Sequence, residues 1–116
     1  MHVAAKGLES YTVHELSYIV MDYITHRLDY VDDDFDIIRM AVIGSRVKET
    51  HRHNSDVDIA FTYEGKYRSD SMNDVLNMNP LFINGIRVDF IPFSVNKGEV
   101  FDNNEKHQDL PIISLE

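Results

Sequence analysis

Apolar residues recur with a helical period near the start of the chain. Thr12 and Glu15 have the spacing of a capping box, in which a threonine and a glutamate satisfy the first amides of a helix. The periodicity predicts an amphipathic helix over residues 12–30, whose apolar stripe packs against a sheet. The stripe consists of Val13, Leu16, Ile19, Val20, Tyr23, Ile24 and Leu28.

Two strand patterns follow this helix. Residues 37–43 are rich in apolar and β-branched side chains, and they end at Gly44, which predicts a largely buried strand. From Asp56 onward the pattern alternates with a period of two. Asp56 and Asp58 are therefore expected on one face of a second strand, and the apolar residues on the other. The core face carries Val57, Ile59 and Phe61.

The next segment predicts a helix and a hairpin. Residues 69–78 have apolar positions at helical spacing behind a polar start, which predicts a second, shorter helix. Asn84-Gly85 is the strongest short-range signal for a two-residue hairpin turn. Residues 81–83 and 86–93 are therefore expected to be its two strands.

The tail has a weaker pattern. Residues 96–98 break the periodicity, and residues 99–107 carry only a weak helical signal. Residues 110–113 are apolar and fit either a final edge strand or a contact with a partner.

Gly44 and Ser45 are the first candidates for a binding role. A glycine at a strand end lets the backbone approach a bulky anion, and the amides of the turn can donate hydrogen bonds to phosphate oxygens together with the Ser45 hydroxyl. Glycines also end many strands without binding anything, so a simple strand-to-helix turn is the alternative.

The carboxylates are the second group of candidates. Asp56 and Asp58 on one face raise each other's pKa and repel, unless solvent or a cation such as Mg²⁺ relieves them. Asp89 lies in an apolar strand, where a lone acid is costly to bury. If the two strands are neighbours, the three acids converge and are sufficient to hold two metal ions. The alternatives are an exposed edge strand for the pair, and an ion pair or an exposed position for Asp89.

These motifs resemble those of the minimal nucleotidyltransferases of the DNA polymerase beta superfamily. The pattern of that family is Gly-Ser, then Asp-x-Asp, then a third acidic residue on a later strand. The order of elements matches from about Thr12 to Phe93, most of the chain. The matching segments are Gly44-Ser45-Arg46, Ser55-Asp56-Val57-Asp58 and Val88-Asp89-Phe90. Ser55 follows Gly44 by eleven residues.

The resemblance implies a fold and a reaction. The fold is α/β, of the α+β kind, with a mixed β-sheet and helices packed mainly on one face. The reaction is transfer of a nucleoside monophosphate from a magnesium-bound nucleoside triphosphate, expected to be ATP, to a hydroxyl acceptor, with release of pyrophosphate. By position, Asp56, Asp58 and Asp89 would be the catalytic and metal-binding acids for two Mg²⁺ ions, and Asp89 would also help to deprotonate the acceptor. The nucleotide would contact Gly44, Ser45, Arg46 and Ser55.

The chain departs from the family pattern in one loop. Family members commonly have a glycine three residues after the position of Arg46, where this chain has Glu49, followed by Thr50 and His51. The loop is therefore bulkier and more polar. Family members of this size often lack a separate acceptor-binding domain, so a partner protein is a candidate source of the acceptor, as in a toxin–antitoxin pair.

Other polar groups have simpler interpretations. The acidic run at residues 32–34, together with Asp36, fits a solvated loop better than a metal site. His51 and His53 are expected to be exposed loop residues, with a transition-metal or phosphate contact as the alternative. The cations near the Gly-Ser turn are candidates for neutralising charge on a transferred phosphoryl group, with an ordinary surface role as the alternative. These cations are Arg46, Lys48 and Arg52.

Size and charge set the outer limits. The 116 residues predict a single domain over residues 1–116. Eleven basic against twenty acidic residues give a net charge of -9, which is unfavourable for general nucleic-acid binding. The absence of cysteine fits a cytoplasmic protein. No apolar run is long enough to predict a membrane span.

The sequence therefore predicts a single-domain, magnesium-dependent nucleotidyltransferase. Two alternatives remain beside it. One is a non-catalytic, antitoxin-like binding partner that keeps the fold to bind another protein. The other is a nucleotide sensor that binds the triphosphate without turnover.

Overall fold

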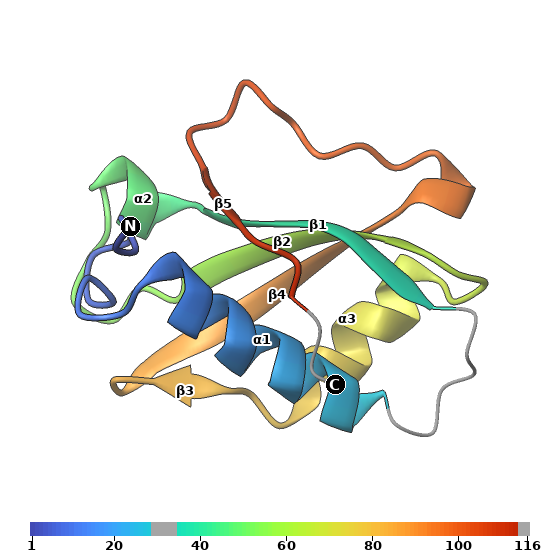
Figure 1. Ribbon diagram of the computed structural model, residues 1–116, viewed down its shortest axis with the longest axis horizontal. Helices are drawn as coiled ribbons and strands as arrows, with labels where there is room; N and C mark the ends of the chain where they lie inside the picture. Colours follow the sequence, from blue (N-terminus) through green and yellow to red (C-terminus); the bar gives the residue numbers. More distant parts are fainter. Residues whose placement is uncertain (29–34, 114–116) are drawn as a thin grey trace.

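The protein is built on one five-stranded mixed sheet. The computed structural model describes residues 1–28 and 35–113, and Figure 1 shows the sheet with its covering elements. The strand order is β3-β4-β2-β1-β5. The central strands β2 and β4 are parallel, whereas β1 is antiparallel to both β2 and β5. The strands are β1 Asp36–Ile43, β2 Val57–Glu64, β3 Phe82–Ile83, β4 Ile86–Ser94 and β5 Gln108–Leu110.

The two longer helices lie on the same side of the sheet (Figure 1). Helix α1 spans Val13–Arg27 and begins with the predicted capping box. The Glu15 amide donates to Thr12 Oγ1, and the Thr12 amide donates to the Glu15 carboxylate. Helix α3 spans Ser69–Met78, as predicted. The predicted end of the first helix at residue 30 and the acidic run at residues 32–34 lie outside the described residues.

The helix-covered face contains the main core. Alternate residues of β1, β2 and β4 point toward α1 and α3 and are buried there, with the Phe90 ring stacked on Tyr23 at 5.4 Å. Burial of these apolar side chains provides most of the driving force for folding. The sheet contributes Met40, Val42, Val57, Ile59, Phe61, Tyr63, Val88 and Phe90 to this cluster.

The opposite face has a smaller cover, made by the segment between β4 and β5. This segment, orange in Figure 1, crosses above the sheet. Its Phe101 is buried, and Arg39 from β1 lies over the Phe101 ring at 4.4 Å. The packed side chains beneath it are Ala41, Ile43, Ala60, Ile91 and Phe93.

The hairpin was predicted correctly. Strands β3 and β4 pair in antiparallel fashion across Asn84 and Gly85. Both turn residues have positive φ values, 52° and 75°, which a two-residue type I′ turn requires and which asparagine and glycine adopt at low cost.

The tail differs in part from its prediction. The weak helical signal over residues 99–107 was wrong, because that segment contains no helix and is held by side-chain contacts to the sheet. The short 3₁₀ helix η1, Val95–Lys97, precedes it. The edge strand β5 contains Leu110, the first residue of the apolar end, whereas residues 111–113 continue beyond it without strand structure. Ser17 Oγ donates a hydrogen bond to the Pro111 carbonyl. The edge-strand alternative therefore holds for Leu110 alone.

The topology brings three strand ends together. Because β2 and β4 are parallel, their first residues lie side by side, and the antiparallel β1 ends at the same edge of the sheet. The predicted α+β fold, a mixed sheet with helices packed mainly on one face, is confirmed.

Candidate active site

Asp58 and Asp89 lie side by side at the edge where β2 and β4 begin. They are register partners in the parallel pairing of these strands. Partners in a parallel pair point to the same face, on strands about 4.8 Å apart. That face is the one opposite α1 and α3, since the neighbouring core residues Val57 and Val88 point to the helices. The pairing of strands expected from the sequence is therefore present.

Electrostatic effects show that Asp56 belongs to the same cluster. Burial, and after it the charges of Asp89 and Asp56, raise the pKa of Asp58 to about 6. The pKa of Asp89 is also raised, first by burial and then by the charge of Asp56, while Arg87 opposes the change. Asp58 and Asp89 are thus held where the charged form of each carboxyl is disfavoured. Such a cluster is a typical feature of functional sites.

Gly44 brings the Gly-Ser turn against this cluster. Its φ is +85°, and a Cβ atom built at this position would lie 2.1 Å from Asp58 Oδ2. Any larger residue would be strained at this φ and would have to displace the Asp58 carboxylate, so the position favours glycine. The close approach that the glycine allows is therefore to a carboxylate of the acidic cluster, and the turn and the acids form one site.

Ser45 begins the short helix α2, Ser45–Lys48, directly after the turn. Gly44 supplies no side-chain cap, and the first amides of a helix have no acceptor within it. The Ser45 amide directly follows Gly44, whose backbone lies against the Asp58 carboxylate. This arrangement supplies hydrogen-bond donors beside an acidic cluster, which is suited to an anion accompanied by cations.

Glu49 keeps the backbone conformation that a glycine would adopt. It caps α2 in the left-handed region, with φ 62° and ψ 29°, and its amide donates to the Ser45 carbonyl. Its carboxylate turns away to an ion pair with Lys6 at 3.0 Å. Glu49 therefore has a backbone conformation that the glycine of the family pattern would adopt without strain.

Two of the predicted nucleotide contacts have their side chains in local hydrogen bonds. Arg46 is only 5% exposed, and its three guanidinium nitrogens each donate to a backbone carbonyl. Ser55 accepts one of these bonds through its carbonyl, and its hydroxyl accepts from the Arg52 amide at 2.9 Å. Both residues thus build the loop between α2 and β2 that leads into Asp56.

Lys48 and Glu105 are further charged residues at the site. Lys48 pairs with Glu105 at 3.0 Å, and both act on Asp58, the lysine lowering and the glutamate raising its pKa. Sequence reasoning missed Glu105, because it lies in the tail segment and nothing local indicates its approach to β2. The aromatic Phe101 four residues earlier, in an otherwise polar stretch, is the one signal that the segment packs on the sheet.

The acids do not form a ready ligand set for a metal ion. Within residues 1–28 and 35–113, no group of three or more His, Cys, Asp and Glu side chains is arranged to hold one. The type of donor nevertheless fits a hard divalent cation, because carboxylate oxygens beside the Gly44 turn are the ligands that Mg²⁺ prefers.

The remaining candidates lie around this centre. His53 is exposed as expected, whereas His51 is half-buried, and its Nδ1 has no hydrogen-bond partner within the part of the chain that is described. Asp36 is exposed at the far end of β1. Arg52 and Lys48 are exposed and remain accessible to a ligand.

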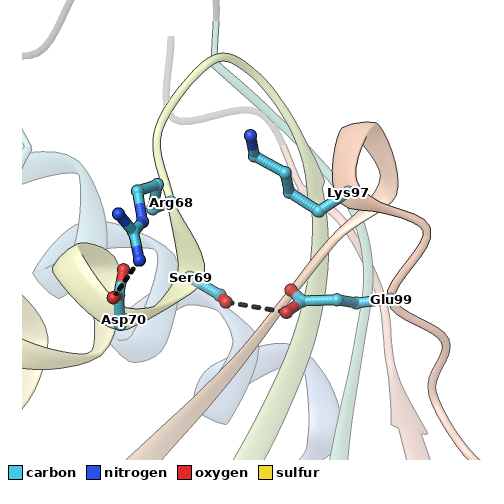
Figure 2. Close-up of a pocket in the computed structure, with 5 residues that line it drawn as sticks. All are labelled: Arg68, Ser69, Asp70, Lys97 and Glu99. Carbon is cyan, nitrogen blue, oxygen red and sulfur yellow. Dashed lines mark hydrogen bonds and ion pairs between the residues drawn. The ribbon is translucent and has the colours of Figure 1, made fainter.

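A separate pocket lies at the start of α3. Figure 2 shows the Ser69–Glu99 hydrogen bond of 2.9 Å and the Arg68–Asp70 ion pair on its walls, while Lys97 makes neither of the drawn contacts. Its volume is about 440 Å³. None of the residues predicted for the catalytic site lines it, so it is distinct from the acidic cluster. Its lining residues are Arg68, Ser69, Asp70, Lys97 and Glu99.

Comparison with known proteins gives one family. No curated protein and no solved structure matched the chain significantly. In the described part of the chain, no helix is both long enough and apolar enough to span a membrane. The family model for polymerase beta nucleotidyltransferase matches residues 28–113, which is most of the chain and includes the turn and all three acids. The chain therefore belongs to the polymerase beta nucleotidyltransferase family.

Proposed function

We propose that this protein is a metal-dependent nucleotidyltransferase, which transfers a nucleoside monophosphate from magnesium-bound ATP to a hydroxyl group and releases pyrophosphate. The observation that carries the proposal is the register pairing of Asp58 with Asp89 directly beside Gly44. Membership of the family supports nucleotidyl transfer as the class of reaction. The metal, the nucleotide and the acceptor are part of the proposal.

The acids have distinct roles in this reaction. Asp56 and Asp58 would hold two Mg²⁺ ions, with Asp89 as the third carboxylate. When bound, the ions neutralise phosphate charge and polarise the reacting oxygens. Asp89 would accept the proton of the acceptor hydroxyl. The hydroxyl oxygen then bonds to the α-phosphorus, and the bond from that phosphorus to the leaving pyrophosphate breaks. The raised pKa of Asp89 suits a proton acceptor.

The Gly-Ser turn would bind the triphosphate. The Gly44 backbone lies against Asp58, and the amide and hydroxyl of Ser45 would donate hydrogen bonds to the phosphate oxygens. Lys48 supplies a cation next to Asp58 and can exchange its Glu105 partner for phosphate oxygens. Ser55 contributes as part of the loop that carries Asp56.

The acceptor would be presented by a partner protein, as in a toxin–antitoxin pair. The described residues form one sheet with its covering helices, and we place the acceptor on a separate protein. We place the reaction in the cytoplasm, where ATP and Mg²⁺ are abundant. The strong negative charge argues against a nucleic acid as acceptor.

A non-catalytic role is the second candidate. The observation that favours it is the absence, in the described residues, of a formed set of three metal ligands. Such a protein would act as a nucleotide sensor or as an antitoxin-like binding partner. It would bind nucleotide or protein without releasing pyrophosphate.

Calorimetry separates these functions at the binding step. ATP and GTP are titrated with and without Mg²⁺ into the wild type and into Asp56→Asn plus Asp58→Asn. The matched control is Asp36→Asn plus Asp74→Asn, which removes the same two charges at exposed positions. Magnesium-dependent binding that only the first double variant loses supports the site. Equal binding by all three proteins would contradict it.

A further inference from the structure

Arg46 is a buried cation that is bound entirely through neutral groups. Its Nε donates to the Ser55 carbonyl at 2.9 Å and its Nη1 to the Lys6 carbonyl at 2.8 Å, with a longer bond of 3.4 Å to His53. No carboxylate in the described part of the chain forms an ion pair with it. The planar guanidinium is therefore used for its fixed hydrogen-bond directions, a use to which lysine is poorly suited.

Two of the acceptors belong to the loop that leads into the acid-bearing strand. Ser55 directly precedes Asp56, so the bond from Arg46 fixes the orientation of the peptide that joins them. The same serine closes a turn with Arg52, since each accepts a bond from the other's backbone amide. Arg46 directly follows the Gly44–Ser45 turn. Its side chain therefore connects this turn by hydrogen bonds to the loop that precedes Asp56.

The third acceptor ties in the N-terminal segment. Lys6 accepts from the Arg46 side chain, and its amide donates to the Arg46 carbonyl at 3.3 Å. A Cβ atom at Gly7 would lie 3.1 Å from Arg46 Nη1 and 2.4 Å from Ile86, so a glycine is needed for this packing. This segment lies before residue 28, outside the match to the family, and yet it supports the site.

We infer that Arg46 is a positioning residue, which holds Asp56 and Asp58 beside the Gly44–Ser45 turn and does not contact the nucleotide. The inference rests on the proposed function for the role of the acids. It replaces the sequence-based expectation that Arg46 binds the triphosphate. A residue that orients metal ligands without touching the metal affects metal binding through the geometry of those ligands. Its loss lowers metal affinity or activity by about 10- to 100-fold.

The test compares Arg46→Lys with Arg52→Lys, a conservative change at an exposed position of the same loop. Binding of Mn²⁺ in the presence of ATP is followed by electron paramagnetic resonance, and binding of metal-free ATP is measured separately. We expect Arg46→Lys to weaken Mn²⁺ binding by about 10- to 100-fold and to leave metal-free ATP binding unchanged. A parallel loss of metal-free ATP binding would show a direct phosphate contact and overturn the inference.

A second measurement uses the wild type and does not depend on how the variant folds. The Nε–H signal of Arg46 in a nitrogen-correlated NMR spectrum should exchange slowly with solvent and keep its position when ATP is added without metal. A fast-exchanging signal, or one that shifts with ATP, would overturn the inference.

Hydrogen exchange of residues 49–56 separates the inference from the proposed function. Exchange of this loop should become at least about tenfold faster in Arg46→Lys and stay unchanged in Arg52→Lys. Unchanged exchange in Arg46→Lys overturns the positioning role even where Mn²⁺ binds normally. If the wild type binds neither Mn²⁺ nor ATP, the proposed function and the predicted loss of metal binding are both overturned. Faster exchange of the loop in Arg46→Lys would still support the role of Arg46 in holding residues 49–56.

Discussion

The two faces of the sheet are built for different purposes. The face under α1 and α3 is closed by large apolar side chains, with stacked rings such as Tyr23 and Phe90. The other face has a small apolar cluster around Phe101 and, at one edge, carboxylates whose charged forms are disfavoured. The helix-covered face stabilises the fold, whereas the clustered carboxylates lower the stability of the opposite face. Such a sacrifice is typical of functional sites.

The largest expected effect is on the acid-bearing face. Replacing Asp58 by asparagine removes a carboxylate from the proposed metal site at nearly constant shape. We expect nucleotidyl transfer to fall by about 10³-fold, the order observed when one group that stabilises transition-state charge is lost. The measurement is pyrophosphate release with a saturating acceptor. Activity within about threefold of the wild type would place the reaction elsewhere.

The second effect compares the two apolar clusters. Phe90→Ala should lower the free energy of unfolding by about 3–5 kcal/mol, because Phe90 is fully buried among large side chains. Phe101→Ala should cost less, about 2 kcal/mol, since its cluster is small and can relax. Urea unfolding monitored by circular dichroism measures both. Equal costs would mean that the two faces contribute alike to stability.

The third effect is the pH dependence of stability. The folded-state pKa of Asp58 is about 6, above the unfolded value, so the folded protein binds the proton more tightly. Protonated Asp58 therefore stabilises the folded state fully at low pH, and this contribution to the free energy of unfolding is lost as the pH rises from about 4 to about 6. Since Asp58 is partly exposed, we expect about 1 kcal/mol, and Asp58→Asn should be the more stable protein at pH 8 by this amount. Chemical unfolding at several pH values tests the sign, and a less stable variant at pH 8 would be inconsistent with it.

The smallest effect concerns the loop before the acids. Glu49 holds a left-handed conformation that glycine adopts without strain. Glu49→Gly should raise the melting temperature by a few degrees, despite the loss of the exposed pair with Lys6. Lys6→Gln, which breaks the same pair and leaves the backbone unchanged, is the control. A lower melting temperature in Glu49→Gly would show that the ion pair outweighs the strain.

The sequence predicted those features that depend on local patterns. Thr12 and Glu15 marked the start of α1, Asn84 and Gly85 marked the hairpin, and the period of two placed Asp58 opposite the core. The acids were therefore found before any strand order was known. Each of these signals lies within a few residues of the structure that it predicts.

The features that the sequence did not predict depend on long-range packing. Glu105 reaches Lys48 because Phe101 and Arg39 fix the tail on the sheet, and no pattern within the tail encodes that contact. Arg46 was expected to face a ligand, because it is a cation directly after the Gly-Ser turn. Its burial depends on carbonyls from Lys6 and Ser55, which only the folded chain brings together.

The most direct test of the central claim is which phosphorus of ATP is transferred. The wild type and Asp58→Asn are incubated with Mg²⁺, a hydroxyl-bearing partner protein, and ATP labelled at either the α- or the γ-phosphorus. Our account predicts that the wild type transfers label from the α-position only, and that Asp58→Asn transfers none. Label from the γ-position, or equal α-labelling by both proteins, would contradict nucleotidyl transfer at this acidic site.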